Sequence, residues 1–360
     1  MIRSKDEKLI TSDHWKVFDQ LKKDRVYLIK FYEDLLDQLY KILNKNFQFK
    51  QSKKYWRIIL GPWLIFYLVS MYDKWRIYKN KNKSKFLNKK SADKSSLLIN
   101  TDLNDFWRKA KSNDDWVNEN YKRIYYYEKF QNLDKFIIKK NSRNIQKKNN
   151  FKFVHYFEYI FSIISIVFSK YIINTHNFSK FNLFKLFLYS KILPANHKIL
   201  FNYDGFQSIE YFNLKKRNLI FNKNQFNKKK DFKNYLYECL KFDFPIIYLE
   251  RFMYLRSKIE WTFNFRKKKI ITMISHVFNE KFKIFLAEMM SRKSKISIIE
   301  HGGCLNYQFD SFFSHENKIS NQIGTWEKFF KKKFFQLPAI QLLNFKDIKK
   351  ENPKNILFIS

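Results

Sequence analysis

A glutamate and a histidine stand directly before two glycines, in the order Glu300-His301-Gly302-Gly303. The apolar run 296–299 comes before them and is predicted to be a buried strand that brings both side chains to its carboxyl end. A histidine there can act as a general base near neutral pH, taking the proton from an attacking hydroxyl group. The chain has only 5 glycines. A Gly-Gly pair therefore indicates backbone angles, or a close approach to the backbone, that a Cβ would prevent. The other interpretation is a tight turn whose histidine hydrogen-bonds the loop.

Four more residues are candidates for the same site. Glu250 is either a second carboxylate of the site or a salt-bridged helix start, and the salt bridge is the favoured interpretation. Asn279 precedes a predicted helix, where an N-cap explains it at least as well as ligand binding. Tyr307 and Trp326 could stack on a sugar ring, although aromatic residues abound in this chain. The sequence shows no P-loop, dinucleotide glycine motif or metal-ligand cluster, so neither a cofactor nor a metal is predicted.

The second half of the chain must supply the elements that position these residues. Short apolar runs alternate there with helical patterns, which predicts a parallel sheet flanked by helices. The predicted strands are 198–201, 218–221, 269–273 and 296–299. Between the last two runs, a helix of about 14 residues carries Phe282, Phe285, Leu286 and Met289 on one face, which makes a strand-helix-strand unit. Ligands bind at the carboxyl ends of such strands, so we expect His301 at that edge.

The first half is predicted to be helical. Apolar residues recur at three- and four-residue spacing over 17–43, which indicates an amphipathic helix or a helix pair. Gly61 and Pro62 follow an apolar run, and proline is damaging inside a helix but tolerated in its first turn. We therefore predict a break near Gly61 and a new helix from Pro62 to Tyr78. The polar, basic segments 79–100 and 141–152 are predicted connectors.

The charge and the apolar pattern limit the possible partners and location. Lys and Arg number 71 against 33 Asp and Glu, a formal net charge of +38. The lysines are scattered, without an arginine-rich arm or zinc-finger spacing, so we predict no nucleic-acid partner and at most a weak attraction to anionic lipid or phosphate-bearing substrates. Two cysteines and a charged N-terminus without an apolar core favour the cytoplasm. The apolar stretches 58–72 and 159–169 are shorter than the ~20 residues that a spanning helix needs, so any membrane contact is expected to be peripheral and weakened by salt.

Several separated segments carry a family resemblance. The first is 55–64, with the sequence YWRIILGPWL. The others are 248–250 (YLE), 279–283 (NEKFK), 287–288 (AE), 300–303 (EHGG), 315–316 (HE), 318–320 (KIS) and Trp326. In these segments the chain resembles a family of transferases from bacterial O-antigen and surface-polysaccharide clusters. That family is similar to GT-B glycosyltransferases and glycerophosphotransferases, which have two Rossmann domains.

The resemblance implies an α/β fold in three parts. A mainly helical region would cover 1–150, a Rossmann-like acceptor-side domain 151–345, and the opening strand of a second Rossmann domain 346–360, with the rest of that domain missing. The implied function is transfer of an activated sugar, or a related phospho-group, onto a surface glycan at the cytoplasmic face of the inner membrane.

The resemblance also implies roles for individual residues. His301 would be the base, Glu300 would orient it and raise its basicity, and Gly302 and Gly303 would admit a lipid-linked or glycan acceptor. The donor would be a nucleotide-activated sugar held by the missing domain, so we expect the chain alone neither to bind such a donor tightly nor to turn over. The alternative function is a non-catalytic basic subunit that binds anionic lipid, glycan or a partner chain.

Overall fold

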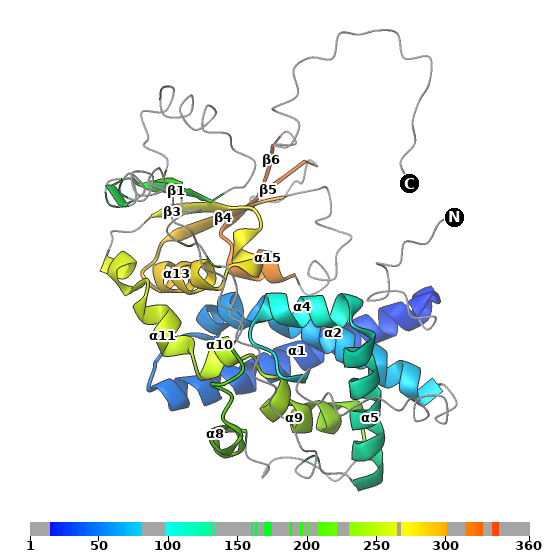
Figure 1. Cartoon of the computed structure of the whole chain (residues 1–360). Helices are drawn as coiled ribbons and strands as arrows, with labels where there is room; N and C mark the ends of the chain where they lie inside the picture. The colour runs from blue at the N-terminus through cyan, green and yellow to red at the C-terminus, as the bar shows by residue number, and fades with distance from the viewer. Residues whose placement is uncertain are drawn as a thin grey trace, which may run out of the picture.

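The computed structural model of the 360-residue chain describes residues 15–80, 98–130, 169–174, 195–196, 208–221, 230–264, 268–300, 314–326 and 333–337, with a few single residues between these ranges. The predicted boundary near 150 and the predicted strand 355–360 lie outside the described residues. A helical region and a layered sheet region are joined in one structure (Figure 1).

The helical region is built around two long helices. They are α1 (Phe18–Phe47) and α2 (Lys53–Asn80), and α4 (Leu103–Ser112), α5 (Asp114–Phe130) and α9 (Phe232–Asp243) pack near them. Helix α1 is amphipathic, as its spacing predicts, and buries residues such as Leu28, Leu35 and Leu39. Helix α2 is different, because most of its length is buried on all sides. A helix that is apolar all round belongs in a protein interior.

The predicted break at Gly61 is wrong. Helix α2 is continuous from Lys53 to Asn80 with Pro62 inside it. An internal proline costs a helix about 3 kcal/mol because it removes one hydrogen bond and crowds the preceding turn. Contacts with α1, α5 and α13 (Glu280–Ser291) hold α2 on several sides along its length. Pro62 would destabilise an isolated helix, but the packing of α2 against these helices outweighs that cost.

The sheet is parallel and lies against the helical region. Its strands are β1 (Tyr171–Asn174), β2 (Ala195–Asn196), β3 (Lys269–Thr272), β4 (Lys295–Ile299), β5 (Gln322–Thr325) and β6 (Phe334–Gln336). They follow the order β2-β1-β3-β4-β5-β6, and every neighbouring pair is parallel. The predicted α/β class and the predicted strands at 269–273 and 296–299 are confirmed. The strand order reverses between β1 and β3, as in doubly wound sheets.

Helices join the two regions. Helix α13 and the short α15 (His315–Ile319) lie between the sheet and α2, and both contact α2 (Figure 1). The predicted apolar face of α13 is confirmed, since Phe282, Phe285, Leu286 and Met289 are all buried. One continuous hydrophobic core runs from α1 and α2 through α13 into β3 and β4.

The predicted strand at 218–221 is wrong, because these residues belong to α8 (Leu214–Ile220) and to the turn after it. Asn213 caps this helix by accepting a hydrogen bond from the Lys216 N–H at 3.0 Å. Arg217 then fixes it from within, donating to three backbone carbonyl groups of 241–244. A four-residue apolar run does not by itself distinguish a strand from a helix. Of the predicted strand 198–201, only Phe201 is described, and it lies in a turn.

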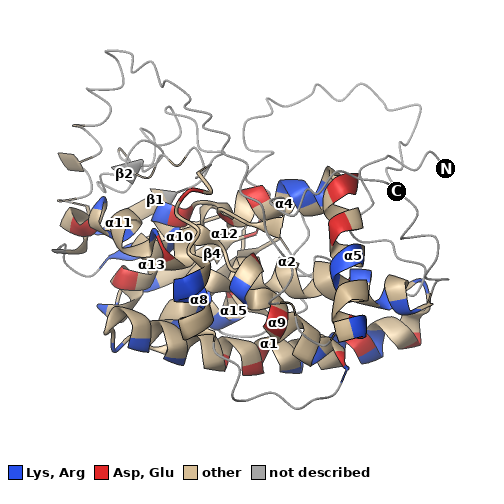
Figure 2. Cartoon of the chain, turned by 60° about the horizontal axis from the view of Figure 1, so that its bottom comes forward, with Lys and Arg blue, Asp and Glu red and all other residues tan. Residues whose placement is uncertain are grey.

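Charged side chains are distributed rather than gathered on the described helices. Figure 2 shows Lys and Arg on α1, α4, α5 and α8, with Asp and Glu between them. Within the described residues, no helix is both long enough and apolar enough to cross a membrane.

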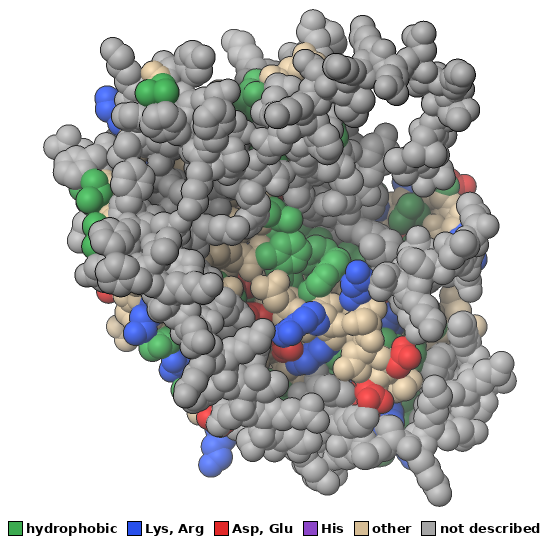
Figure 3. All heavy atoms as spheres, turned by 45° about the horizontal axis from the view of Figure 1, so that its top comes forward, with side chains coloured by type: hydrophobic (Ala, Val, Ile, Leu, Met, Phe, Trp, Pro, Cys, Tyr) green, Lys and Arg blue, Asp and Glu red, His purple; other side chains and the backbone are tan. Residues whose placement is uncertain are grey.

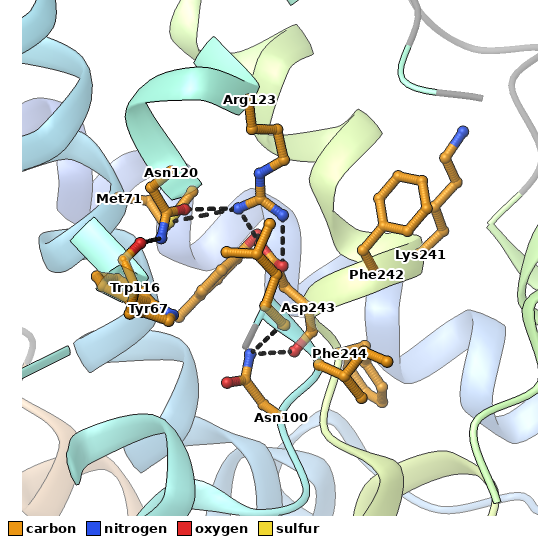
Figure 4. Close-up of polar contacts among 12 residues, drawn as sticks. Tyr67, Met71, Asn100, Trp116, Asn120, Arg123, Lys241, Phe242, Asp243 and Phe244 are labelled. Carbon is orange, nitrogen blue, oxygen red and sulfur yellow. Dashed lines mark hydrogen bonds and ion pairs between the residues drawn. The ribbon is translucent and has the colours of Figure 1, made fainter. Parts of the chain in front are cut away.

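A buried ion pair fastens α5 to the end of α9. Arg123 donates to both carboxylate oxygens of Asp243, at 2.6 and 2.9 Å, and both side chains are almost completely buried (Figure 4). The same carboxylate accepts from the Tyr67 hydroxyl at 2.8 Å, and the Asn120 side chain accepts from Arg123 at 2.8 Å. Burial of a charge is tolerable when it is paired and hydrogen-bonded in this way, and of the Arg123 donors Nε alone lacks a partner in the described structure. This cluster is structural, since packed side chains surround it.

Candidate functional site at the carboxyl ends of the strands

Three adjacent strands end at one edge of the sheet. Strands β3, β4 and β5 end at Thr272, Ile299 and Thr325, and because they are parallel their carboxyl ends share an edge. Such an edge is where ligands bind in open α/β sheets. Figure 3 brings the top of Figure 1 forward and shows hydrophobic side chains beside Lys, Arg, Asp and Glu side chains at the centre of that face.

Glu300 is the first residue after β4 and lies at this edge. Its backbone N–H donates to the carbonyl oxygen of Gly324 at 2.8 Å, and its Oε2 accepts from the Trp326 N–H at 3.0 Å. The side chain is 7% exposed. Glu300 therefore links the end of β4 to the end of β5, and the bond from the Trp326 N–H holds its carboxylate towards β5.

The remaining residues of this motif are outside the described part of the chain. His301, Gly302, Gly303 and Tyr307 all fall in the range 301–313. Their catalytic and binding roles stay predictions. Glu300, the residue immediately before them, stands at the edge where the sequence predicts the motif.

A histidine that the sequence analysis did not select lies close to this edge. His276 belongs to the short helix α12 (Ser275–Phe278), which follows β3. Its Nε2 lies 3.0 Å from Oε1 of Glu316 in α15. Because a carboxylate only accepts hydrogen bonds, Nε2 of His276 is the donor in this contact. His276 is completely buried, and Nδ1 has no hydrogen-bond partner in the described structure. The Glu316 carboxylate thus fixes the orientation of the His276 ring, and the complete burial of that ring makes the pair a link between α12 and α15.

His315, the first residue of α15 and the one before Glu316, is held as a neutral imidazole. It is 1% exposed. Burial lowers its pKa well below the ordinary value, and the charges of His276, Arg57, Lys283 and Lys318 act in the same direction. Neither ring nitrogen has a hydrogen-bond partner in the described structure, so burial of the ring costs free energy even in its neutral form, and what the ring contributes is a packing contact with Gly61 of α2. His315 therefore serves to seat α15 on α2.

A fully buried triad lies at the start of α13. Glu280 accepts from the Tyr248 hydroxyl at 2.8 Å and pairs with Lys283 at 2.7 Å, and Lys283 also donates to the Tyr248 oxygen at 2.8 Å. Burial raises the pKa of Glu280 to about 7, and the charge of Lys283 opposes this rise. Burial also lowers the pKa of Lys283. The triad joins α13 to α10 (Ile246–Leu249), and its proton occupancy is sensitive to pH near neutrality.

Asn279 caps α13, as one of the two interpretations of the sequence predicts. Its Oδ1 accepts from the Phe282 N–H at 3.0 Å, and its Nδ2 donates to the Phe201 carbonyl oxygen at 2.7 Å. Both ends of the amide group are thus engaged within the fold. A role in binding substrate stays a prediction.

Glu250 takes part in a buried salt bridge, which agrees with the favoured interpretation. Arg217 donates to both of its carboxylate oxygens, from Nε at 2.6 Å and from Nη2 at 2.8 Å. The Glu250 side chain is 6% exposed. No hydrogen bond joins Glu250 to Asn279 or Glu300 in the described structure. The salt bridge fastens α8 to the start of α11 (Phe252–Ser257).

Four residues of these clusters are not among those predicted from the sequence: His276, Glu316, Lys283 and Tyr248. The last three lie inside segments that carry the family resemblance, so a signal was present for them. His276 has no such signal, because its partner Glu316 is 40 residues away in the chain. In the ranges that the structure describes, no three His, Cys, Asp or Glu side chains converge in the manner of a metal site.

A family comparison places this chain among the transferases. The family described as LIC12162 family transferase matches residues 2–360, almost the whole of the 360-residue sequence. No curated protein and no solved structure matches the chain significantly. Because the family match extends over both the helical region and the sheet, the chain belongs to the LIC12162 family of transferases.

Proposed function

We propose that this chain transfers an activated sugar, or a related phospho-group, onto a surface glycan, with a lipid-linked or glycan acceptor at the cytoplasmic face of the membrane. Membership of a transferase family supports a group-transfer reaction. The observation that carries the site is the position of Glu300. It directly follows β4 at the carboxyl edge, is held there by the backbone of Gly324 and Trp326, and directly precedes His301.

In the proposed reaction His301 is the general base. The acceptor hydroxyl gives its proton to His301 as its oxygen forms a bond to the transferred sugar carbon. The bond from that carbon to the nucleotide phosphate breaks, and the electron pair leaves with the phosphate. The negative charge of Glu300 stabilises the imidazolium that forms. Gly302 and Gly303 give the acceptor room beside the backbone.

Cells provide the first test, because they contain the natural donor and acceptor. We expect deletion of the coding sequence to shorten or remove a surface polysaccharide, seen as a changed gel ladder. The wild-type chain should restore the ladder, whereas Glu300→Gln and His301→Ala should not. Glu210→Gln is the matched control, since Glu210 is exposed and remote in sequence from the motif. Immunoblots should show equal amounts of each variant.

A second test measures transfer directly. Because the purified chain is not expected to turn over alone, it is mixed with membranes and cytosol of the deletion strain, which supply the acceptor and any partner it needs, and with a panel of radiolabelled nucleotide sugars. We expect incorporation into lipid-extractable glycan, reduced at least about 100-fold by His301→Ala, because a general base contributes 10²–10⁴-fold.

Two outcomes would contradict the proposal. Full restoration of the ladder by both His301→Ala and Glu300→Gln would favour the non-catalytic binding subunit. An unchanged polysaccharide in the deletion strain would refute a role in surface glycan synthesis.

A further inference from the structure

The first half of α1 presents an exposed face with two kinds of side chain. Phe18 is 74% exposed and Val26 is 65% exposed, high values for apolar residues. Lys22 and Lys30 are exposed as well. These four residues recur every four positions and so form one stripe along a helix. The stripe extends for about 18 Å at 1.5 Å per residue.

Other side chains widen this stripe. Val17 is 60% exposed and Tyr27 is 40% exposed. Lys23 is exposed, and it lies seven residues before Lys30 on the same side of the helix. We call Val17, Phe18, Lys22, Lys23, Val26, Tyr27 and Lys30 the α1 stripe. The opposite face of α1 is buried against the core, so the stripe lies at the outside of the helical region (Figure 1, dark blue).

The charges of the stripe lack the compensation found elsewhere on α1. None of Lys22, Lys23 and Lys30 has an ion pair or hydrogen bond through its side chain in the described structure. In the second half of the same helix, the carboxylates are paired: Glu33 with Arg57 and Lys318, and Asp37 with Lys41. The stripe therefore offers unpaired positive charge interleaved with apolar side chains.

We propose that the α1 stripe docks on an anionic lipid bilayer. Lysines attract anionic headgroups, while Phe18 and Val26 enter the boundary between headgroups and acyl chains. A second copy of the chain fits less well, because two stripes of the same charge repel each other. Nucleic acid also fits less well, because bases could stack on Phe18 and Tyr27 but would not bury Val17 and Val26, whereas acyl chains bury all four. Docking here rests on the proposed function, since it brings a transferase to a lipid-linked acceptor.

Vesicle sedimentation tests this proposal without any transfer assay, so its failure is distinct from failure of the proposed function. The full-length chain is mixed with vesicles of phosphatidylcholine alone or of phosphatidylcholine with phosphatidylglycerol. We expect binding only to the vesicles with phosphatidylglycerol, and weaker binding as NaCl rises from about 0.05 M to about 0.5 M.

Paired variants distinguish the stripe from general attraction by a chain of net charge +38. Lys22→Gln, Lys23→Gln and Lys30→Gln combined should weaken binding on the order of 100-fold, because each lysine near an anionic surface contributes about a fivefold factor. The control combines Lys215→Gln, Lys293→Gln and Lys295→Gln, which removes the same charge from other exposed sites.

A second pair tests the apolar part. Phe18→Ser with Val26→Ser should weaken binding roughly tenfold or more. Its control is Leu219→Ser with Met253→Ser, two apolar side chains that are 80% and 46% exposed on other helices. All these positions are exposed, so circular dichroism should show unchanged folding. Equal losses in stripe and control variants, or no binding to phosphatidylglycerol vesicles, would overturn the proposal.

Discussion

Gly61 of α2 lies directly against the imidazole ring of His315. A Cβ placed on Gly61 would stand 2.4 Å from Cε1 and 2.6 Å from Nδ1 of that ring, and 3.0 Å from the Tyr32 hydroxyl oxygen. The absence of a side chain thus lets α15 approach the backbone of α2. This explains a glycine in a helix interior, where it costs about 1 kcal/mol relative to alanine.

Gly61→Ala should therefore destabilise the protein by about 1–3 kcal/mol, because overpacking outweighs the gain in helix propensity. Urea unfolding followed by circular dichroism measures this change. In a His315→Ala background the ring is gone, and the same substitution should cost much less. An equal cost in both backgrounds would show that the contact with His315 is not the reason for the glycine.

Arg123→Met should lower the free energy of unfolding by about 3–5 kcal/mol, because it leaves the Asp243 carboxylate buried without its partner. Denaturant unfolding gives this value. Arg123→Met combined with Asp243→Leu should recover part of the loss, since no buried charge remains. Lys41→Met is the control. It breaks an ion pair with Asp37 whose side chains are 62% and 39% exposed, and it should cost less than about 1 kcal/mol. Similar losses for the two single variants would contradict the structural role of the buried pair.

The Glu280 carboxyl should make stability fall as pH rises towards neutrality. Its folded pKa is about 7, above the ordinary 4.5, so the native state binds this proton more tightly than the unfolded state does. The contribution is fully present below the ordinary pKa and is lost as the pH rises through the folded pKa. The comparison is with Glu280→Gln and Lys283→Met combined, which removes both charged groups. The stability of the wild type relative to this variant should decrease between about pH 4.5 and about 7. A flat or rising difference would show that Glu280 is charged throughout this range.

Glu33 should act in the opposite direction in acid. Burial alone would raise its pKa, but hydrogen bonds from Arg57 and Lys318 outweigh burial and lower the pKa to about 2. Its contribution to stability is present above the ordinary pKa of 4.5 and is lost as the pH falls towards 2. Glu33→Gln should flatten this part of the acid unfolding curve, measured by fluorescence at a fixed urea concentration. If Glu33→Gln loses stability as steeply as the wild type when the pH falls from 4.5 towards 2, other carboxylates account for the acid unfolding.

Local patterns were enough to predict several elements. The spacing of apolar residues gives α1, the apolar runs give β3 and β4, and the intervening periodicity gives α13 with Asn279 as its cap. These features depend on residues within a few positions of one another, and backbone geometry converts such spacing directly into structure. The same reasoning brought Glu300 to the carboxyl end of a parallel strand.

Tertiary structure decided what local patterns leave open. Packing against several helices keeps α2 continuous through Pro62. The hydrogen bonds of Arg217 hold residues 214–220 as a helix, although their apolar run suits a strand equally well. The pairing of His276 with Glu316 joins residues 40 positions apart, and that of Tyr248 with Glu280 joins residues 32 apart. The sequence by itself determined which side chains could do chemistry and the local elements that carry them. Only the folded chain decided which of them meet, because such contacts depend on how whole layers pack rather than on the residues beside them.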